Sequence, residues 1–357
     1  MLVTAACAPP SDGGGDSGTD TSATATSVAD FGGLDGLVAA AKKEGQLNVI
    51  ALPPDWANYG NIIKAFTAKY GIKINSATPD GSSQDEINAV KQQGKTNRAP
   101  DVLDMGGAVT VANQSLYAPY KVQTWADIPD SQKEATGLWV NDYGGYMSIG
   151  YDSAKLPAVT SITDLEKPAF KGKVALNGDP TQANAALNGV EMASLATGGS
   201  LDDISKGVEW FKKLNGLKNF SKTQATSATV KSGSTPVVFD WDYLQVGHQA
   251  DVKAWKVFIP ENAVLGGYYN QAINKNAPHP AAARLWEEFL FSDEGQNLWL
   301  AGGAHPVRQE AMTTAGTIDK DAVAKLPKVE GTPVFQTQAQ VTKASEYLAA
   351  NWAKAIG

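Results

Sequence analysis

From residue 34 onward, apolar residues recur at helical spacing in some segments and as continuous short runs in others. LDGLVAAAKKEG and NIIKAFTAKYG read as amphipathic helices that stop at glycines, whereas QLNVIAL, IKINSAT and APDVLDMGG read as short strands. Strand and helix alternate along this part of the chain. The pattern therefore predicts an α/β lobe whose mainly parallel sheet is covered by helices on both faces.

The middle of the chain repeats the same order. YGGYMSIGYD, KVALNG and TPVVFDW read as strands, and a long helix is expected to start near Pro180. Further on, AAARLWEEFLFSDEGQNLWLAGG predicts two helices. A second lobe of the same α/β class follows from this repetition.

Composition is consistent with two domain-sized cores. The chain has 357 residues, of which 43% are hydrophobic and 19% charged. Its formal net charge of −7 argues against nucleic acid as a partner, because phosphates require a basic surface. No run of apolar residues reaches the length of a transmembrane helix.

The only cysteine, Cys7, precedes a stretch rich in Gly, Ser, Thr and Asp. A single cysteine excludes an internal disulfide and any Cys-x-x-Cys site. Residues 1–33 are predicted to form a disordered tether, since they contain too few apolar groups to offset the entropy of ordering. The passage Thr4-Ala5-Ala6-Cys7 resembles the end of a bacterial lipoprotein signal peptide, which implies a lipidated Cys7 and attachment to a membrane surface. An incidental cysteine in a disordered tail is the alternative.

Candidate ligand-binding residues lie in the loops that follow the predicted strands, where open α/β sheets bind their ligands. Carboxylates and aromatic rings recur in these loops, and Lys and Arg do not. Together with one position on a later strand, the candidates are Asp55, Trp56, Tyr59, Asp80, Ser82, Gly106, Gly107, Asp179, Gln182, Trp241, Asp242, Tyr243 and Tyr268.

The segments LVAAAKKEGQLNVIAL and AARLWEEFLFSDEGQNLWLAGGAHPVRQEA resemble the type II solute-binding proteins of bacterial ABC importers, and the resemblance spans Leu34 to Met312. It implies an extracytoplasmic, monomeric protein of two α/β lobes that delivers a small solute to a membrane permease. The two strands that cross between the lobes are expected near residues 145–152 and 266–275. The first lobe would comprise residues 34–148 plus 265–312, the second 149–264, and residues 313–357 would pack as helices on the lobes.

Within this family, Trp56-Ala57-Asn58-Tyr59 resembles the Trp-x-x-Tyr loop of spermidine and putrescine binders. The segment FDWDY at residues 239–243 falls where those proteins place a ligand-facing Trp, and Asp179 and Gln182 fall where they have acidic residues. The neutral Gln182, and the Gly106-Gly107 pair where aromatic residues are usual, depart from that pattern. The resemblance implies a polyamine as the cargo.

A cationic amine also suits these residue types on physical grounds. An ammonium that leaves water needs carboxylates or an aromatic face, and a cation over a Trp ring gains roughly 0.5–2 kcal/mol. Trp56 and Trp241 are therefore predicted to be stacking walls, and Tyr59 a hydrogen-bonding group. Asp55, Asp179 and Asp242 are the predicted anchors. Because side chains alternate along a strand, Trp241 rather than Asp240 is expected to face the ligand.

Other interpretations compete with these assignments. Trp56 and Tyr59 could fix their loop to the next helix, Asp179 could be a helix N-cap, and Asp80 and Ser82 could be turn and cap residues.

Some of these residues also suit other cargoes. Thiamine would suit the same residues as a polyamine, and Tyr268-Tyr269 resembles the adjacent tyrosines of iron(III)-binding relatives although it falls on the returning strand. A phosphonate would require Arg or Lys in the loops.

An enzyme is disfavoured. The sequence has no nucleophile elbow, no His-Glu-x-x-His and no phosphate loop, and none of its three histidines has a partner at metal-ligand spacing. No cofactor or metal is predicted. A carbohydrate-active enzyme using paired Asp residues is the remaining alternative of another class.

Overall fold

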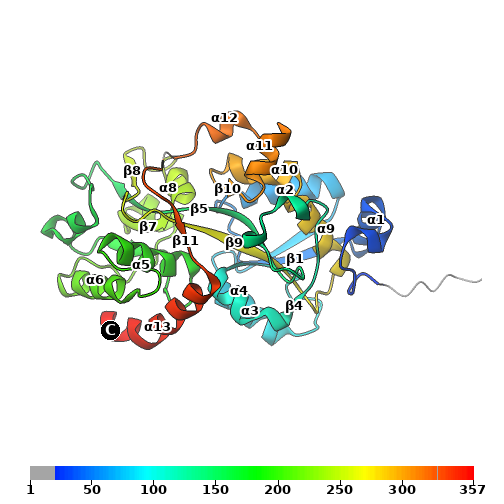
Figure 1. Ribbon diagram of the computed structural model, residues 1–357, viewed down its shortest axis with the longest axis horizontal. Helices are drawn as coiled ribbons and strands as arrows, with labels where there is room; N and C mark the ends of the chain where they lie inside the picture. Colours follow the sequence, from blue (N-terminus) through cyan, green and yellow to red (C-terminus); the bar gives the residue numbers. More distant parts are fainter. Residues whose placement is uncertain (1–20, 328) are drawn as a thin grey trace, which may run out of the picture.

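The computed structural model describes residues 21–327 and 329–357, which form an α/β protein of two lobes (Figure 1). The strands are β1 Gln46–Ile50, β2 Lys73–Ala77, β3 Val102–Gly106, β4 Tyr117–Ala118, β5 Val140–Asp152, β6 Val174–Leu176, β7 Val237–Trp241, β8 Trp255–Phe258, β9 Leu265–Asn274, β10 His305–Pro306 and β11 Val334–Phe335. The α-helices are α1 Leu34–Glu44, α2 Tyr59–Tyr70, α3 Ser83–Gln93, α4 Gly107–Ala112, α5 Asn184–Ala196, α6 Ser205–Gly216, α7 Ser227–Ser232, α8 Asp242–His248, α9 Pro280–Leu290, α10 Asp293–Ala301, α11 Gln309–Ala315, α12 Lys320–Val323 and α13 Gln338–Ile356. Short 3-10 helices are η1 Val28–Phe31, η2 Gln114–Leu116, η3 Trp125–Asp127, η4 Asp130–Gln132, η5 Ile162–Glu166 and η6 Pro168–Phe170.

Local sequence accounts for the element ends near the site. Helix α1 ends at Gly45 and α2 at Gly71, and both glycines adopt the left-handed conformation that a C-cap favours. The Ser82 side chain caps α3, while the Asp85 carboxylate accepts a hydrogen bond from the Ser82 backbone N–H. These elements match the predictions from hydrophobic spacing.

The sheets are mixed rather than mainly parallel. β1 pairs with β2, and β6 with β7, in parallel, as expected for strand–helix–strand units. β3 runs antiparallel to β9, and β7 runs antiparallel to β5. The antiparallel pairings arise because β5 and β9 are the long strands that carry the chain from one lobe to the other and back.

β5 and β9 cover the stretches where the crossing strands were expected. The first part of β5 pairs with β9, at positions from Val140 to Tyr146, whereas its last part pairs with β7 through Met147 to Tyr151. β5 therefore belongs to both lobes, as its central position in Figure 1 shows.

Residues 21–33, expected to be part of the tether, are instead packed against the first lobe. The buried Arg284 side chain donates hydrogen bonds to the carbonyls of Ala23 and Ala25, and Ser27 forms a bridge to Lys121. The segment is rich in polar residues, and its sequence does not indicate that its backbone carbonyls accept hydrogen bonds from Arg284. Cys7 lies outside the described residues.

The C-terminal helix α13 spans the two lobes. It packs on α4 of the first lobe and on α6 of the second (Figure 1). The Gln340 amide donates to Asp202, and the Trp352 ring lies 5.6 Å from the Phe211 ring. Across the described residues, no helix is both long and apolar enough to cross a membrane.

Candidate functional site

A cavity of about 270 Å³ lies between the lobes. The first lobe contributes the loops after β1 and β2, the start of α3 and the middle of β3. The second lobe contributes the segment after β6, the start of α5, the loop before α7 and the end of β7. These are mostly strand-end loops and helix N-termini, as an open α/β sheet would place them. The volume is just below the usual range for ligand pockets, so it suits a small solute.

The cavity wall is acidic. Asp55 and Asp80 are exposed at the wall, whereas Glu86, Asp104 and Asp240 are buried in it. None of the described residues that line the cavity is Lys or Arg. Burial raises the pKa of Glu86 and of Asp104 far above the ordinary carboxyl value, and raises the pKa of Asp240 to about 7. Burial in the wall thus disfavours the ionised carboxylates that a cationic solute would stabilise.

Asp104, in the middle of β3, is held by two tyrosines. Its Oδ2 accepts a hydrogen bond of 2.6 Å from the Tyr59 hydroxyl and one of 3.0 Å from the Tyr143 hydroxyl. Its Oδ1 is buried and has no hydrogen-bond partner among the described residues. A buried carboxylate oxygen without a partner is costly, so this atom marks a place where a donor from a ligand would stabilise the protein.

Tyr59 itself does not line the cavity. It is fully buried, and Gln271 donates to its hydroxyl at 3.0 Å. Tyr59 therefore does not face the cavity as predicted; its hydroxyl bonds instead to the carboxylate of Asp104, which does line it.

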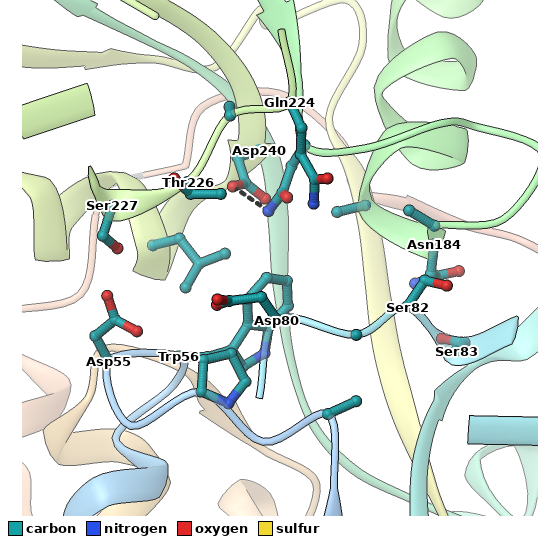
Figure 2. Close-up of a pocket in the computed structure, with 18 of the residues that line it drawn as sticks. Asp55, Trp56, Asp80, Ser82, Ser83, Asn184, Gln224, Thr226, Ser227 and Asp240 are labelled. Atoms are coloured by element: carbon teal, nitrogen blue, oxygen red, sulfur yellow. Dashed lines mark hydrogen bonds between the residues drawn. The ribbon is translucent and has the colours of Figure 1, made fainter. Parts of the chain in front are cut away.

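On β7, the side chain that faces the cavity is Asp240, and not Trp241 as expected. Its Oδ2 accepts from the Asn177 amide at 2.8 Å, and its Oδ1 from the Trp241 backbone N–H at 2.9 Å (Figure 2). The Trp241 ring is fully buried and stacks on Tyr243 with 6.4 Å between centroids. The two side chains alternate as predicted, but with the opposite orientation.

Trp56 lies in the wall as predicted (Figure 2). Its indole N–H donates to the Tyr143 hydroxyl at 2.7 Å, and its ring meets Tyr269 edge-on at 5.6 Å. These contacts fix the ring, so that it offers a rigid aromatic surface to a ligand.

Three other predicted residues lie outside the cavity lining. Asp242 is fully buried at the start of α8, where its Oδ1 accepts from the Tyr146 backbone N–H at 3.0 Å. Tyr243 is buried among aromatic rings. Tyr268 stacks on Phe335 at the other face of β9, and its neighbour Tyr269 lines the cavity instead. Because successive side chains of a strand point to opposite faces, Tyr269 lines the cavity and Tyr268 does not.

Four more predicted residues, in two groups, also lie outside the cavity lining. Asp179 and Gln182 are exposed and away from the cavity, since the Asp179 carboxylate accepts from the Thr181 N–H and hydroxyl in a local turn. Gly106 and Gly107 do not line the cavity either. A Cβ on Gly106 would lie 2.1 Å from that of Asn184, so this glycine permits the two lobes to approach each other.

Asp55, Asp80 and Ser82 line the cavity as predicted. The sequence analysis missed several polar lining residues, mainly from the second lobe: Ser83, Asn177, Asn184, Gln224, Thr226, Ser227, His248 and Tyr269. Thr226 caps the short helix α7, which is a signal readable from sequence. Gln224 has no such signal, because it lies on a loop without a preceding strand.

Backbone conformation also marks the loops around the cavity. Of the five described non-glycine residues with positive φ, four lie in the loops after β1 and β2: Ala51, Ala57, Asn58 and Thr78. Such conformations are costly and tend to occur at functional sites. Among the described residues there is no group of three or more His, Cys, Asp or Glu side chains arranged to hold a metal ion.

Comparison with known proteins agrees with this architecture. The family model described as bacterial extracellular solute-binding protein matches residues 109–329. The structure resembles the periplasmic binding protein P5PA, at 20% identity and a TM-score of 0.69, over 88% of this chain and 100% of that one.

Two further solved structures are similar. Iron-bound HitA from Pseudomonas aeruginosa matches at 21% identity and a TM-score of 0.65, over 87% of this chain and 99% of that one. AgtB from A. tumefaciens R10 in complex with agropinic acid matches at 17% identity and a TM-score of 0.68, over 87% of this chain and 98% of that one. At these identities the likeness establishes the two-lobed fold, and the family match covers more than half of the sequence. The chain therefore belongs to the bacterial extracellular solute-binding protein family.

Proposed function

We propose that this protein captures a small cationic solute in the cavity between its lobes and delivers it to an ABC permease in the membrane. Members of its family are extracytoplasmic, non-enzymatic components of solute transport. Closure of two lobes around a solute would supply the signal that the permease reads. Attachment to the membrane through a lipidated Cys7, and a monomeric state, remain predictions from the sequence.

The observation that carries the proposal is the unpartnered Oδ1 of Asp104 in a wall without Lys or Arg. An ammonium group there would donate to this oxygen, and its charge would stabilise the ionised forms of Glu86 and Asp240. The Trp56 ring would cover the methylene groups of the solute. A short diamine such as putrescine satisfies both requirements within the small volume, and thiamine offers the same kind of charge.

Iron(III) is the second candidate. It is favoured by the solved structures of iron-bound HitA and of ferric-binding proteins, and by the presence of Tyr269 in the wall. Against it, Tyr268 faces away, and burial raises the pKa of the Tyr269 hydroxyl, which opposes the tyrosinate form that a ferric ion needs. A phosphonate, or a sugar phosphate, would meet carboxylates without a countercharge in this wall.

Isothermal titration calorimetry with putrescine, spermidine, thiamine and ferric citrate tests the proposal. An amine should bind, and Asp104→Asn should weaken its binding by about tenfold to a hundredfold, since a hydrogen bond to a charged group contributes roughly 1.5–3 kcal/mol. Tyr269→Phe should leave amine affinity largely intact. If only ferric citrate binds, and Tyr269→Phe abolishes that binding, iron is the cargo and the amine proposal is wrong. Turnover of a sugar would favour the enzyme alternative.

A further inference from the structure

We infer that the solute carries a carboxylate as well as an ammonium group, so that the cavity selects a small zwitterion of the amino-acid type. The inference rests on the proposed function, because it keeps the ammonium at Asp104 and adds a second point of recognition at the start of α5.

The N-terminus of α5 is open toward the cavity. This helix has 13 residues, and its N-cap is Ala183, whose side chain cannot accept a hydrogen bond. The backbone N–H groups of Asn184 and Ala185 have no acceptor among the described residues, and both residues line the cavity. The first N–H groups of a helix carry partial positive charge and are a common binding place for anions. By contrast, Ser82 caps the neighbouring α3.

The serine next to that cap adds a hydroxyl donor on the same side. Ser83 lies close to Asn184 at one side of the cavity (Figure 2). The Ser83 Oγ accepts a hydrogen bond of 3.0 Å from the Gly106 N–H, so its own proton is available to a ligand. Gly106 in turn lies directly against the Asn184 side chain. A carboxylate at this point would be bound by donors from both lobes and would hold them closed.

The unpartnered Oδ1 of Asp104 is the second, independent observation. Asp104 is 7% exposed, and it precedes Gly106 by two residues on β3, which corresponds to about 7 Å along a strand. In a small zwitterion, a short covalent chain joins the ammonium to the carboxylate. This chain, with one hydrogen bond from each group to the protein, spans a similar distance. The positive and negative groups of one small solute can therefore reach both places at once.

Charge balance favours a zwitterion over the simpler solutes. An anion alone would face the carboxylates of Glu86, Asp104 and Asp240 with no Lys or Arg in the described residues of the wall. A cation alone would make no use of the N–H groups of Asn184 and Ala185, and would leave them without an acceptor wherever the bound solute displaces water from them. A zwitterion satisfies both sets of groups.

Matched pairs of probes test the inference. Putrescine and cadaverine are ornithine and lysine without the carboxylate, so calorimetry with these four compounds isolates that group. We expect the amino acid of at least one pair to bind about tenfold more tightly than its diamine. Since the comparison uses the unmodified protein, it does not depend on any variant folding.

Two variants at one position isolate the backbone donor. Asn184→Pro removes the N–H at the first position of α5, where proline is well tolerated, and the preceding Ala183 has the extended conformation that proline requires. Asn184→Ala loses the same side chain but keeps the N–H. Ornithine or lysine should bind about tenfold more weakly to Asn184→Pro than to Asn184→Ala, whereas a diamine should bind both variants equally.

The outcomes separate this inference from the proposed function. If a diamine binds as tightly as its amino acid, or if the two variants bind the amino acid equally, the zwitterion is wrong and the cationic solute stands. If neither member of any pair binds, the zwitterion is wrong, and the cationic solute fails as well unless spermidine or thiamine binds.

Discussion

Asp240 allows a test of how much the burial of a carboxylate in the cavity wall lowers the free energy of unfolding. Its carboxyl is 3% exposed, and burial raises its pKa to about 7. An aspartate in an unfolded chain has a pKa near 3.9, so the folded value is higher by about 3 units. Each unit corresponds to about 1.4 kcal/mol, and the ionised carboxylate therefore destabilises the unliganded protein by about 4 kcal/mol above pH 7.

The sign of the pH dependence follows from the raised value. Below about pH 4 the carboxyl is protonated in both states and the penalty is absent. The penalty develops as the pH rises from the unfolded-state pKa near 4 to the folded-state pKa of about 7, and it is complete above that value. Asp240→Asn should remove it. The substituted amide can still accept from the Trp241 N–H, and the Asn177 amide can rotate to offer its oxygen. We expect the free energy of unfolding to rise by about 4 kcal/mol at pH 8 and by less than half as much at pH 5.

Urea unfolding of the unliganded protein at both pH values, followed by tryptophan fluorescence, measures this difference. Asp55→Asn is the matched control, because Asp55 lies in the same wall but is exposed, and its substitution should change stability little at either pH. The reasoning is refuted if Asp240→Asn gains no more stability at pH 8 than at pH 5, or if Asp55→Asn gives the same result.

Three further predictions concern binding and closure. The affinity for an amine should fall at least about tenfold between pH 8 and pH 6 in calorimetry, because protonation of Asp104 and Asp240, whose pKa values burial raises to about 7, competes with the cation; a constant affinity would contradict the role of these carboxylates. Gly106→Ala should weaken binding and enlarge the ligand-bound protein in small-angle scattering, since the added Cβ would lie 2.1 Å from the Asn184 Cβ; an unchanged scattering profile would contradict the close approach. Trp56→Phe should remove most of the ligand-induced change in tryptophan fluorescence, because Trp56 is the tryptophan in the wall; an undiminished change would place the solute elsewhere.

The sequence predicted those parts of the fold in which local and tertiary preferences agree. Helices α1 and α2 have clear apolar spacing and glycine stops, and the segment between them holds the buried strand β1. The loop after β1 was expected to bring Asp55 and Trp56 to the cleft, and both line the cavity between the lobes; their contact with a ligand stays a prediction. Residues 21–33 could not be placed, because their packing depends on Arg284, far along the chain.

The orientation of β7 was not predictable from its residues. All five of its side chains are buried, so the strand has no exposed face and no polar alternation that could reveal which side chains point to the cavity. The start of α5 was misplaced for a related reason. Asp179 resembles an N-cap, but its carboxylate bonds within its own turn, and the helix begins only at Asn184. The open helix end that results has no signature in sequence.

Helix α13 has a consequence for unloading of the solute. It is bound to the second lobe, where the Asn215 amide donates to the Ile356 carbonyl at 3.2 Å, and it also packs on α4 of the first lobe. Separation of the lobes must therefore either detach α13 from α4 or deform one of the two helices. Such a cost would favour the arrangement of the lobes in this structure even without solute, and it would add to the apparent affinity. A permease that separates the lobes would have to overcome it together with the contacts to the solute, so we expect the C-terminal helix to slow the release of the cargo.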